Sequence, residues 1–155
     1  MKTKSGIPYL PDNDLAGPAD LINPIRARRT GGKLLNLDRI LLHSPPFARG
    51  WNSMFGAIRN QLSLSPKLRE LAIVAIGVLN KADYEYAQHT PHFLKAGGTR
   101  EQLGALADVS AALDDTKLFD EAERATLALT CEMTRNITVA DATMKRVRAI
   151  LPDRP

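Results

Sequence analysis

The feature of this sequence that most constrains its fold is an apolar segment near the middle of the chain. Residues 68–79 read LRELAIVAIGVL and, beyond the first turn of a helix, are apolar on nearly every side. A helix that lacks a polar face has to be covered by other elements, so we expect this one to lie in the middle of a helical bundle. Its only charges, Arg69 and Glu70, stand in the first turn, where the helix dipole favours a carboxylate.

The remainder of the chain after residue 18 also has helical apolar spacing. The predicted helices cover residues 19–29, 35–43, 46–62, 66–80, 83–96, 100–113, 119–135 and 139–150. The predicted helix starts are Ser65 with Pro66, Thr99 with Gln102, and Thr138 with Asp141, and the predicted stop is Gly97 with Gly98. No stretch alternates as a β-strand does, so we expect an all-α fold of about seven or eight helices.

Residues 1–18 have a different character. They contain Pro8, Pro11, Gly17 and Pro18 and show no helical period, so we expect an extended N-terminal arm. A chain of 155 residues has room for one sizeable core. We therefore expect residues 19–155 to form a single helical domain.

Composition excludes several classes of protein. Cys131 is the single cysteine, so an intrachain disulfide, a CxxC redox pair and a cysteine-rich zinc site are excluded. The longest apolar run, residues 71–79, is far shorter than the roughly twenty residues of a membrane span. The N-terminal residues lack the apolar core of a secretory signal, and we expect a cytoplasmic protein.

Charge is unevenly distributed along the chain. Residues 1–69 hold eleven Lys and Arg against four Asp and Glu, whereas residues 70–155 hold ten against thirteen. Such halves can attract one another within a chain or between subunits, and the basic half can attract anionic ligands. The densest basic run, residues 26–33, has no aromatic side chain to stack on bases, so nucleic-acid binding is not expected.

Two neighbouring helices carry the titratable residues. Glu85, His89 and His92 stand at i, i+4 and i+7 and share one face, and Pro91 predicts a kink beside the imidazoles. Such a stripe is also compatible with an ordinary surface ion pair. On the preceding helix, Gly77 lies on the face of Glu70 and permits close approach of a neighbour, whose cover would raise the pKa of Glu70.

These residues resemble the motif of a known superfamily. Glu70, eleven intervening residues, ADYEYAQH ending at His89, and then FLKAG resemble the core of the carboxymuconolactone decarboxylase and alkylhydroperoxidase D-like superfamily. Its thiol peroxidases have Cys-x-x-Cys where this chain has Ala82 and Glu85. A dithiol peroxidase cycle cannot run without those thiols. The chain thus looks like the cysteine-free branch, and the resemblance implies an alkylhydroperoxidase D-like helical bundle.

The resemblance also implies an activity. The family decarboxylase acts on a small carboxylated lactone without metal or organic cofactor. By analogy His89 is the proton shuttle, Glu85 orients it, and Glu70 is a second carboxylate facing the same cavity. We expect decarboxylation or isomerisation of a small, anionic carboxylate or lactone, no cofactor, and a homo-oligomer, a trimer or hexamer, with sites near its subunit interfaces.

Three further residues are candidates for substrate binding. They are Tyr84, His92 and Arg69, although Arg69 and Glu70, as adjacent residues of a helix, are expected to point apart. Tyr84 and Tyr86 are on different sides of their helix, and periodicity does not decide which of them reaches the cavity.

Other functions stay open for the same residues. Glu70, Glu85, His89 and His92 have the donor atoms that suit zinc or iron, although we expect no metal. The chain could also be an alkylhydroperoxidase-like protein without the CxxC, related to peroxiredoxin-type antioxidants, or a non-catalytic oligomeric scaffold. Cys131 lies among apolar residues and is expected to act as a small buried hydrophobe.

Overall fold

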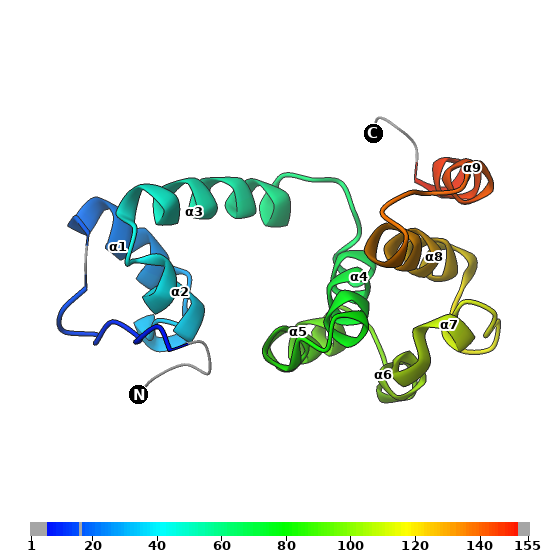
Figure 1. The fold of residues 1–155 in the computed structure, drawn as a ribbon, viewed down its shortest axis with the longest axis horizontal. Coiled ribbons are helices and arrows are strands. Elements are labelled where there is room, and N and C mark those ends of the chain that lie inside the picture. Colours follow the sequence, from blue (N-terminus) through cyan, green and yellow to red (C-terminus); the bar gives the residue numbers. More distant parts are fainter. Residues whose placement is uncertain (1–5, 16, 152–155) are drawn as a thin grey trace. The chain divides into compact units, whose positions relative to one another are not determined.

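The computed structural model describes residues 6–15 and 17–151, and these form helices joined by loops, without a β-strand (Figure 1). The all-α prediction is confirmed. Two compact units are present, one within residues 1–62 and the other within residues 63–155. The single-domain prediction for residues 19–155 stays a prediction. Residues 1–5 and 16 of the predicted arm, and the last four residues of the predicted domain, lie outside the described residues.

The described residues of the first unit contain three α-helices and one short 3₁₀ turn. These are α1 (Ala19–Ala27), η1 (Thr30–Gly32), α2 (Asn36–Leu41) and α3 (Pro45–Asn60). Its small core is formed by Leu21, Ile25, Leu34, Leu42 and Ala48. The preceding segment has no helix in its described part, and it runs beside α2, because the backbone N–H of Leu10 donates to the carbonyl of Arg39.

The second unit contains the apolar helix. Its elements are α4 (Pro66–Leu79), α5 (Asp83–Lys95), α6 (Arg100–Ala105), η2 (Leu106–Asp108), α7 (Val109–Ala112), α8 (Glu121–Arg135) and α9 (Asp141–Ile150). α4 packs against both α5 and α8 and buries Leu71, Val74 and Ala75 completely. Ile76 on its other side is 42% exposed, so the apolar helix is central to the unit but not covered all round.

A glycine sets the distance between α4 and α5. An added Cβ at Gly77 would lie 3.2 Å from the backbone nitrogen of Tyr86 and 3.3 Å from its Cα. The turn between the two helices is tight: Lys81 has a left-handed φ of 53°, and the N–H of Ala82 donates to the carbonyl of Gly77 at 2.8 Å. The predicted close approach of another helix at Gly77 is therefore observed, and α5 is the helix concerned.

α5 ends where the two predicted glycines stand. Gly97 has a φ of 98°, in the left-handed region that glycine tolerates, and Gly98 donates its N–H to the carbonyl of Phe93 at 2.9 Å. A Cβ at Gly98 would lie 2.3 Å from the ring of Phe93, so this second glycine is needed for space. Pro91 lies inside α5, and the helix continues past it to Lys95.

The prediction of one continuous helix over residues 100–113 is wrong. The chain breaks there into α6, η2 and α7, because Asp108 leaves the helical region with φ −123° and ψ 90°. Its side chain accepts from the N–H of Ala111 at 3.0 Å and so starts a new helix. Asp108 therefore acts as an N-cap inside a segment whose apolar spacing is continuous.

Local capping was predicted with mixed success. The box of Thr99 and Gln102 is confirmed by reciprocal hydrogen bonds of 3.1 Å. The capping box predicted for Thr138 and Asp141 is wrong, because the N-cap of α9 is Ala140. The N–H of Ala140 donates to the carboxylate of Glu132. Ser65 precedes α4 as predicted, but its side chain makes no capping hydrogen bond.

Within residues 6–15 and 17–151, none of the helices has both the length and the apolar character that crossing a bilayer requires.

Candidate functional site

The centre of the candidate site is a hydrogen bond between α4 and α5. Oε2 of Glu70 lies 2.7 Å from Nδ1 of His89, and the two side chains are 8% and 15% exposed. Both groups are thus largely withdrawn from water, where a hydrogen bond to a charged group is shorter and stronger than one between neutral groups. Two residues that are nineteen positions apart in the sequence form one polar pair.

The packing of the two helices explains this pairing. α4 and α5 are joined by a short turn, so α5 returns beside α4 and its first turns lie against the end of α4. Gly77 brings the backbones close at Tyr86. His89 is nearly one turn beyond Tyr86, on the side from which its ring reaches the carboxylate of Glu70.

The expected rise in the pKa of Glu70 is wrong. Burial does act in that direction and is the largest single influence on this carboxyl. The hydrogen bond and charge of His89, together with the hydrogen bond and charge of Arg69, outweigh burial and lower the pKa below its ordinary value. Glu70 is therefore ionised near neutral pH. It accepts hydrogen bonds and has no proton to donate to a substrate.

Glu85 has a weaker contact with the imidazole than the sequence suggested. Its Oε2 lies 3.7 Å from Nε2 of His89, too far for a direct hydrogen bond, and its side chain is 45% exposed. The carboxylate that lies against Nδ1 belongs to Glu70. His89 thus stands between two carboxylates, with the close one supplied by the other helix.

A cavity of about 360 Å³ opens beside Glu70. Its lining residues come from the start of α4 and the end of α5: Ser65, Pro66, Lys67, Arg69, Glu70, His92, Lys95 and Ala96. Most of the ionisable groups among them are basic. The cavity therefore has the charge that favours a small anion.

Two of these basic residues were missed by the sequence analysis. Lys67 is held by the buried carboxylate of Glu123 on α8, at 2.6 Å. Lys95 is one turn beyond His92 on α5, and among the described residues no ion pair to it is formed. The helical spacing of Lys95 from His92 was a usable signal, whereas the contact of Lys67 with Glu123 depends on how α8 packs.

Of the other predicted site residues, Arg69 and His92 line the cavity, whereas His89 and Tyr84 do not. Arg69 lines the cavity, and its Nε donates to Oε1 of Glu70 at 3.2 Å, so the expectation that these neighbours point apart is wrong. His92 also lines the cavity, with its ring centre 5.9 Å from that of His89. His89 itself is not a lining residue, and it reaches the cavity wall through Glu70. Tyr84 is 39% exposed and does not line this cavity.

The candidate metal donors in the sequence are Glu70, Glu85, His89 and His92. Within the described parts of the chain, no three side chains of His, Cys, Asp or Glu come together as a set that could hold an ion. Glu70 and His89 bind each other instead. The absence of a metal or other cofactor stays a prediction.

Comparison with known proteins gives the family. The model of the carboxymuconolactone decarboxylase family matches residues 45–130, which include α3, α4, α5 and most of α8. The chain belongs to the carboxymuconolactone decarboxylase family. A search of curated proteins and a search of solved structures each found no match. Assembly into trimers or hexamers and a cytoplasmic location stay predictions.

This member of the carboxymuconolactone decarboxylase family lacks the cysteine pair of the superfamily's thiol peroxidases. Ala82 is the N-cap of α5 and Glu85 is in its first turn, at the positions where the thiol peroxidases of the superfamily have cysteines. Cys131 is on α8, where it is half-buried and packs against the apolar core of the unit. The matched region of this family member therefore offers a carboxylate and imidazole pair at its centre.

Proposed function

We propose that this protein catalyses cofactor-free acid/base chemistry, a decarboxylation or isomerisation, on a small carboxylate or lactone. The observation that carries the proposal is the 2.7 Å contact between Glu70 and His89 beside a cavity with a basic lining. In this proposal His89 moves the proton, Glu70 orients its ring, and the cavity holds the anionic part of the substrate.

The hydrogen bond assigns the two ring nitrogens different tasks. An ionised carboxylate can only accept, so Nδ1 of a neutral His89 carries the hydrogen that it donates to Glu70. Nε2, the nitrogen on the Glu85 side of the ring, then has the lone pair and exchanges the proton. Because His89 does not line the cavity, the reacting part of the substrate has to extend from the cavity past Glu70 to that side of the ring. Glu85, 3.7 Å from Nε2, stabilises the imidazolium that forms when a proton arrives.

The proton balance is simple for both reactions. In an isomerisation, Nε2 removes a proton from a carbon beside a carbonyl and returns it to another carbon of the same substrate. In a decarboxylation, His89 starts as the imidazolium, with hydrogen on both nitrogens. The carbon–carbon bond to the carboxylate breaks, CO₂ leaves, and the electron pair left on carbon takes the proton from Nε2, which leaves neutral His89 with its hydrogen on Nδ1. His89 then recovers its proton from solvent.

Substrate binding is attributed to the basic residues of the cavity. Arg69 is paired with Glu70, and Lys67 is paired with Glu123, so part of their charge is already compensated. Lys95 has no such ion pair among the described residues, and it lines the cavity together with His92. We therefore assign the substrate carboxylate to the end of the cavity where Lys95 and His92 stand.

The activity can be tested on a panel of carboxylated unsaturated γ-lactones, with CO₂ release and ultraviolet absorbance as readouts. General acid/base catalysis contributes about 10²- to 10⁴-fold, so H89Q should lose activity on that scale. H43Q is the matched control, because His43 belongs to the first unit and its ring contacts the carbonyl of Pro8. Equal activity of H89Q and the unaltered protein contradicts the proposal.

The tautomer can be tested without a substrate. A long-range proton–nitrogen NMR spectrum near neutral pH should show hydrogen on Nδ1 of neutral His89, and E70Q should change the nitrogen shifts of that ring. A ring with its hydrogen on Nε2, unaffected by E70Q, contradicts the assignment of Nε2 as the base. Inactivity on the whole panel combined with that result favours the scaffold function.

A further inference from the structure

A second cavity, also of about 360 Å³, lies in the first unit between α1 and α3. α1 lies outside the region that matches the carboxymuconolactone decarboxylase family, so the family match does not cover this wall of the cavity. The proposed acid/base site belongs to the other unit. A ligand bound in this cavity would therefore not depend on the proposed function.

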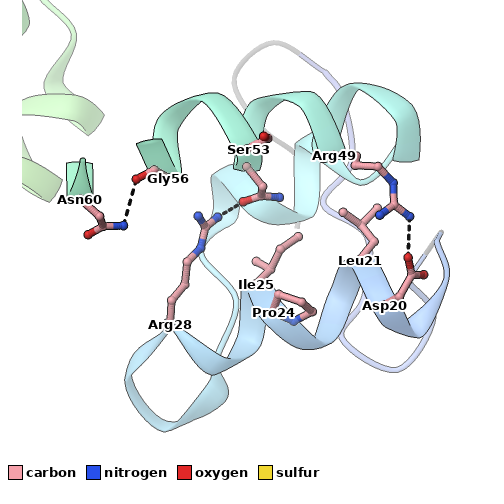
Figure 2. A pocket seen from close by; sticks show the side chains of 10 residues that line it. Asp20, Leu21, Pro24, Ile25, Arg28, Arg49, Ser53, Gly56 and Asn60 are labelled. Carbon is pink, nitrogen blue, oxygen red and sulfur yellow. Dashed lines mark hydrogen bonds and ion pairs between the residues drawn. The ribbon is translucent and has the colours of Figure 1, made fainter. Parts of the chain in front are cut away.

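The floor of this cavity is apolar and its ends are polar. Figure 2 shows Ile25, Pro24 and Leu21 of α1 along the floor, with Arg28 at one end and the pair of Arg49 and Asp20 at the other. Nη2 of Arg49 donates to Oδ2 of Asp20 at 2.9 Å, so that end is close to neutral. The cavity is thus amphipathic along its length.

The wall formed by α3 leaves space and supplies polar groups. Gly56 lines the cavity, and an added Cβ there would meet nothing within 4 Å. The side-chain amide of Asn60 donates to the carbonyl of Gly56 at 3.0 Å, and Ser53 stands at the same wall (Figure 2). These groups can hydrogen-bond a ligand that lies along α3.

The Arg28 end has an excess of positive charge. Arg29 binds the buried carboxylate of Asp38 through two hydrogen bonds of 2.6 and 2.8 Å, whereas Arg28 is 3.8 Å from it. Burial, followed by the charges of Arg29 and Arg59, lowers the pKa of Arg28, although Asp38 acts in the opposite sense. Arg28 and Arg29 thus share the carboxylate of Asp38, and a further anion at Arg28 would relieve the repulsion between these two arginines.

Arg28 is also held in place for such an anion. Its guanidinium donates to the side-chain oxygen of Asn52, whose amide donates to the carbonyl of Ala48 at 2.8 Å. This arrangement fixes Arg28 against α3 at the end of the groove, with other N–H groups of the guanidinium still available. A guanidinium that is already ordered loses less freedom on binding a carboxylate than a mobile one.

We propose that this cavity binds a small organic monocarboxylate, with its carboxylate at Arg28 and its apolar body along Pro24, Ile25 and Gly56. A carboxylate matches the planar fork of a guanidinium with two parallel hydrogen bonds. Pro24 is exposed, whereas Leu21 and Ile25 are only 4% and 2% exposed, so the apolar floor accounts for a short hydrocarbon body, and the neutral ion pair at the far end limits the length of the ligand that fits.

The probe is hexanoate, titrated into the full-length ¹⁵N-labelled chain and followed by proton–nitrogen NMR. For a ligand of this size the dissociation constant should be on the order of 1 mM. The backbone N–H of Gly56 and the side-chain amides of Asn52 and Asn60 should shift and saturate together. Hexanamide, which has the same shape without the charge, and acetate, which lacks the apolar body, should each bind about tenfold more weakly.

Three variants separate the contributions. R28Q should weaken hexanoate binding by about tenfold or more. G56L should abolish binding by filling the groove, and it should fold because leucine is a better helix former than glycine. G50L is the matched control: Gly50 is on the same helix, its added Cβ also meets nothing within 4 Å, and it does not line the cavity, so binding should be unchanged.

Several results overturn the proposal. They are equal binding of hexanoate and hexanamide, unchanged binding by G56L, or shifts that appear only around Lys95 and His92 of the other unit. If R28Q does not fold because its contact with Asn52 is lost, the comparison of hexanoate with hexanamide and that of G56L with G50L still decide the question.

Discussion

Replacing Glu70 by glutamine tests the central pair of the site through the stability of the fold. The carboxylate is 8% exposed and accepts from Nδ1 of His89 at 2.7 Å and from Nε of Arg69 at 3.2 Å. Glutamine has the same size but only one acceptor oxygen, and its amide faces one of the two donors. Leaving a buried donor without a partner costs about 1–3 kcal/mol, so we expect E70Q to lose about 2 kcal/mol of unfolding free energy at pH 7.

The loss should depend on pH with a definite sign. Because the folded protein lowers the pKa of Glu70 below its ordinary value of 4.5, the stabilisation by this carboxylate is fully present above pH 4.5 and is lost as the pH falls through the lower, folded value. Glutamine does not titrate. The difference in unfolding free energy between the unaltered protein and E70Q should thus shrink as the pH falls below about 4.5.

The measurement is urea unfolding followed by circular dichroism, at pH 7 and at acidic pH. E85Q is the matched control, because Glu85 touches the same ring from 3.7 Å with a side chain that is 45% exposed, and such a contact contributes less than about 1 kcal/mol. Equal stability of E70Q and the unaltered protein at pH 7, or a larger loss in E85Q than in E70Q, refutes the reasoning.

Two further predictions concern other parts of the second unit. G98A should destabilise the fold by about 1–3 kcal/mol, because its Cβ would lie 2.3 Å from the ring of the fully buried Phe93, whereas G104A, with nothing within 4 Å of its Cβ, should raise the melting temperature. The pKa of Glu121, lowered to about 2 mainly by its hydrogen bond to Arg146, should return toward 4.5 in R146Q, as a carbon-detected NMR titration can show; an unchanged value contradicts this ion pair.

Helix positions could be predicted from the sequence because their causes are local. Pro66 is acceptable in the first turn of α4, where its missing N–H has no intrahelical partner, and Gly97 adopts the left-handed conformation that ends α5. The capping box of Thr99 and Gln102 needs residues only three positions apart. Asp108 was missed because apolar spacing does not show when a side chain starts a new helix inside a continuous pattern.

Glu70, His89 and His92 could be recognised from the sequence, but Lys67 and Lys95 were missed, and the sequence did not show which side chains pair. The resemblance to the family implied that Glu85 orients His89, and the spacing of four residues on one helix agreed with that role. The structure places Glu70 closer, at 2.7 Å against 3.7 Å. That difference arises from the close approach of α4 and α5 at Gly77, which helical periodicity does not describe.

The direction of the pKa shift of Glu70 also depends on packing that the sequence does not show. Burial of Glu70 was expected only if a helix that approaches at Gly77 covers it, and burial is observed, but the direction of its pKa shift depends on how many donors reach the carboxylate. Both cavities likewise depend on residues from two helices. The sequence by itself determined the all-α fold, most helix ends and the motif, because these follow from hydrogen bonds and spacing within one helix. Only the tertiary structure decided which charges meet, because distances between helices depend on packing.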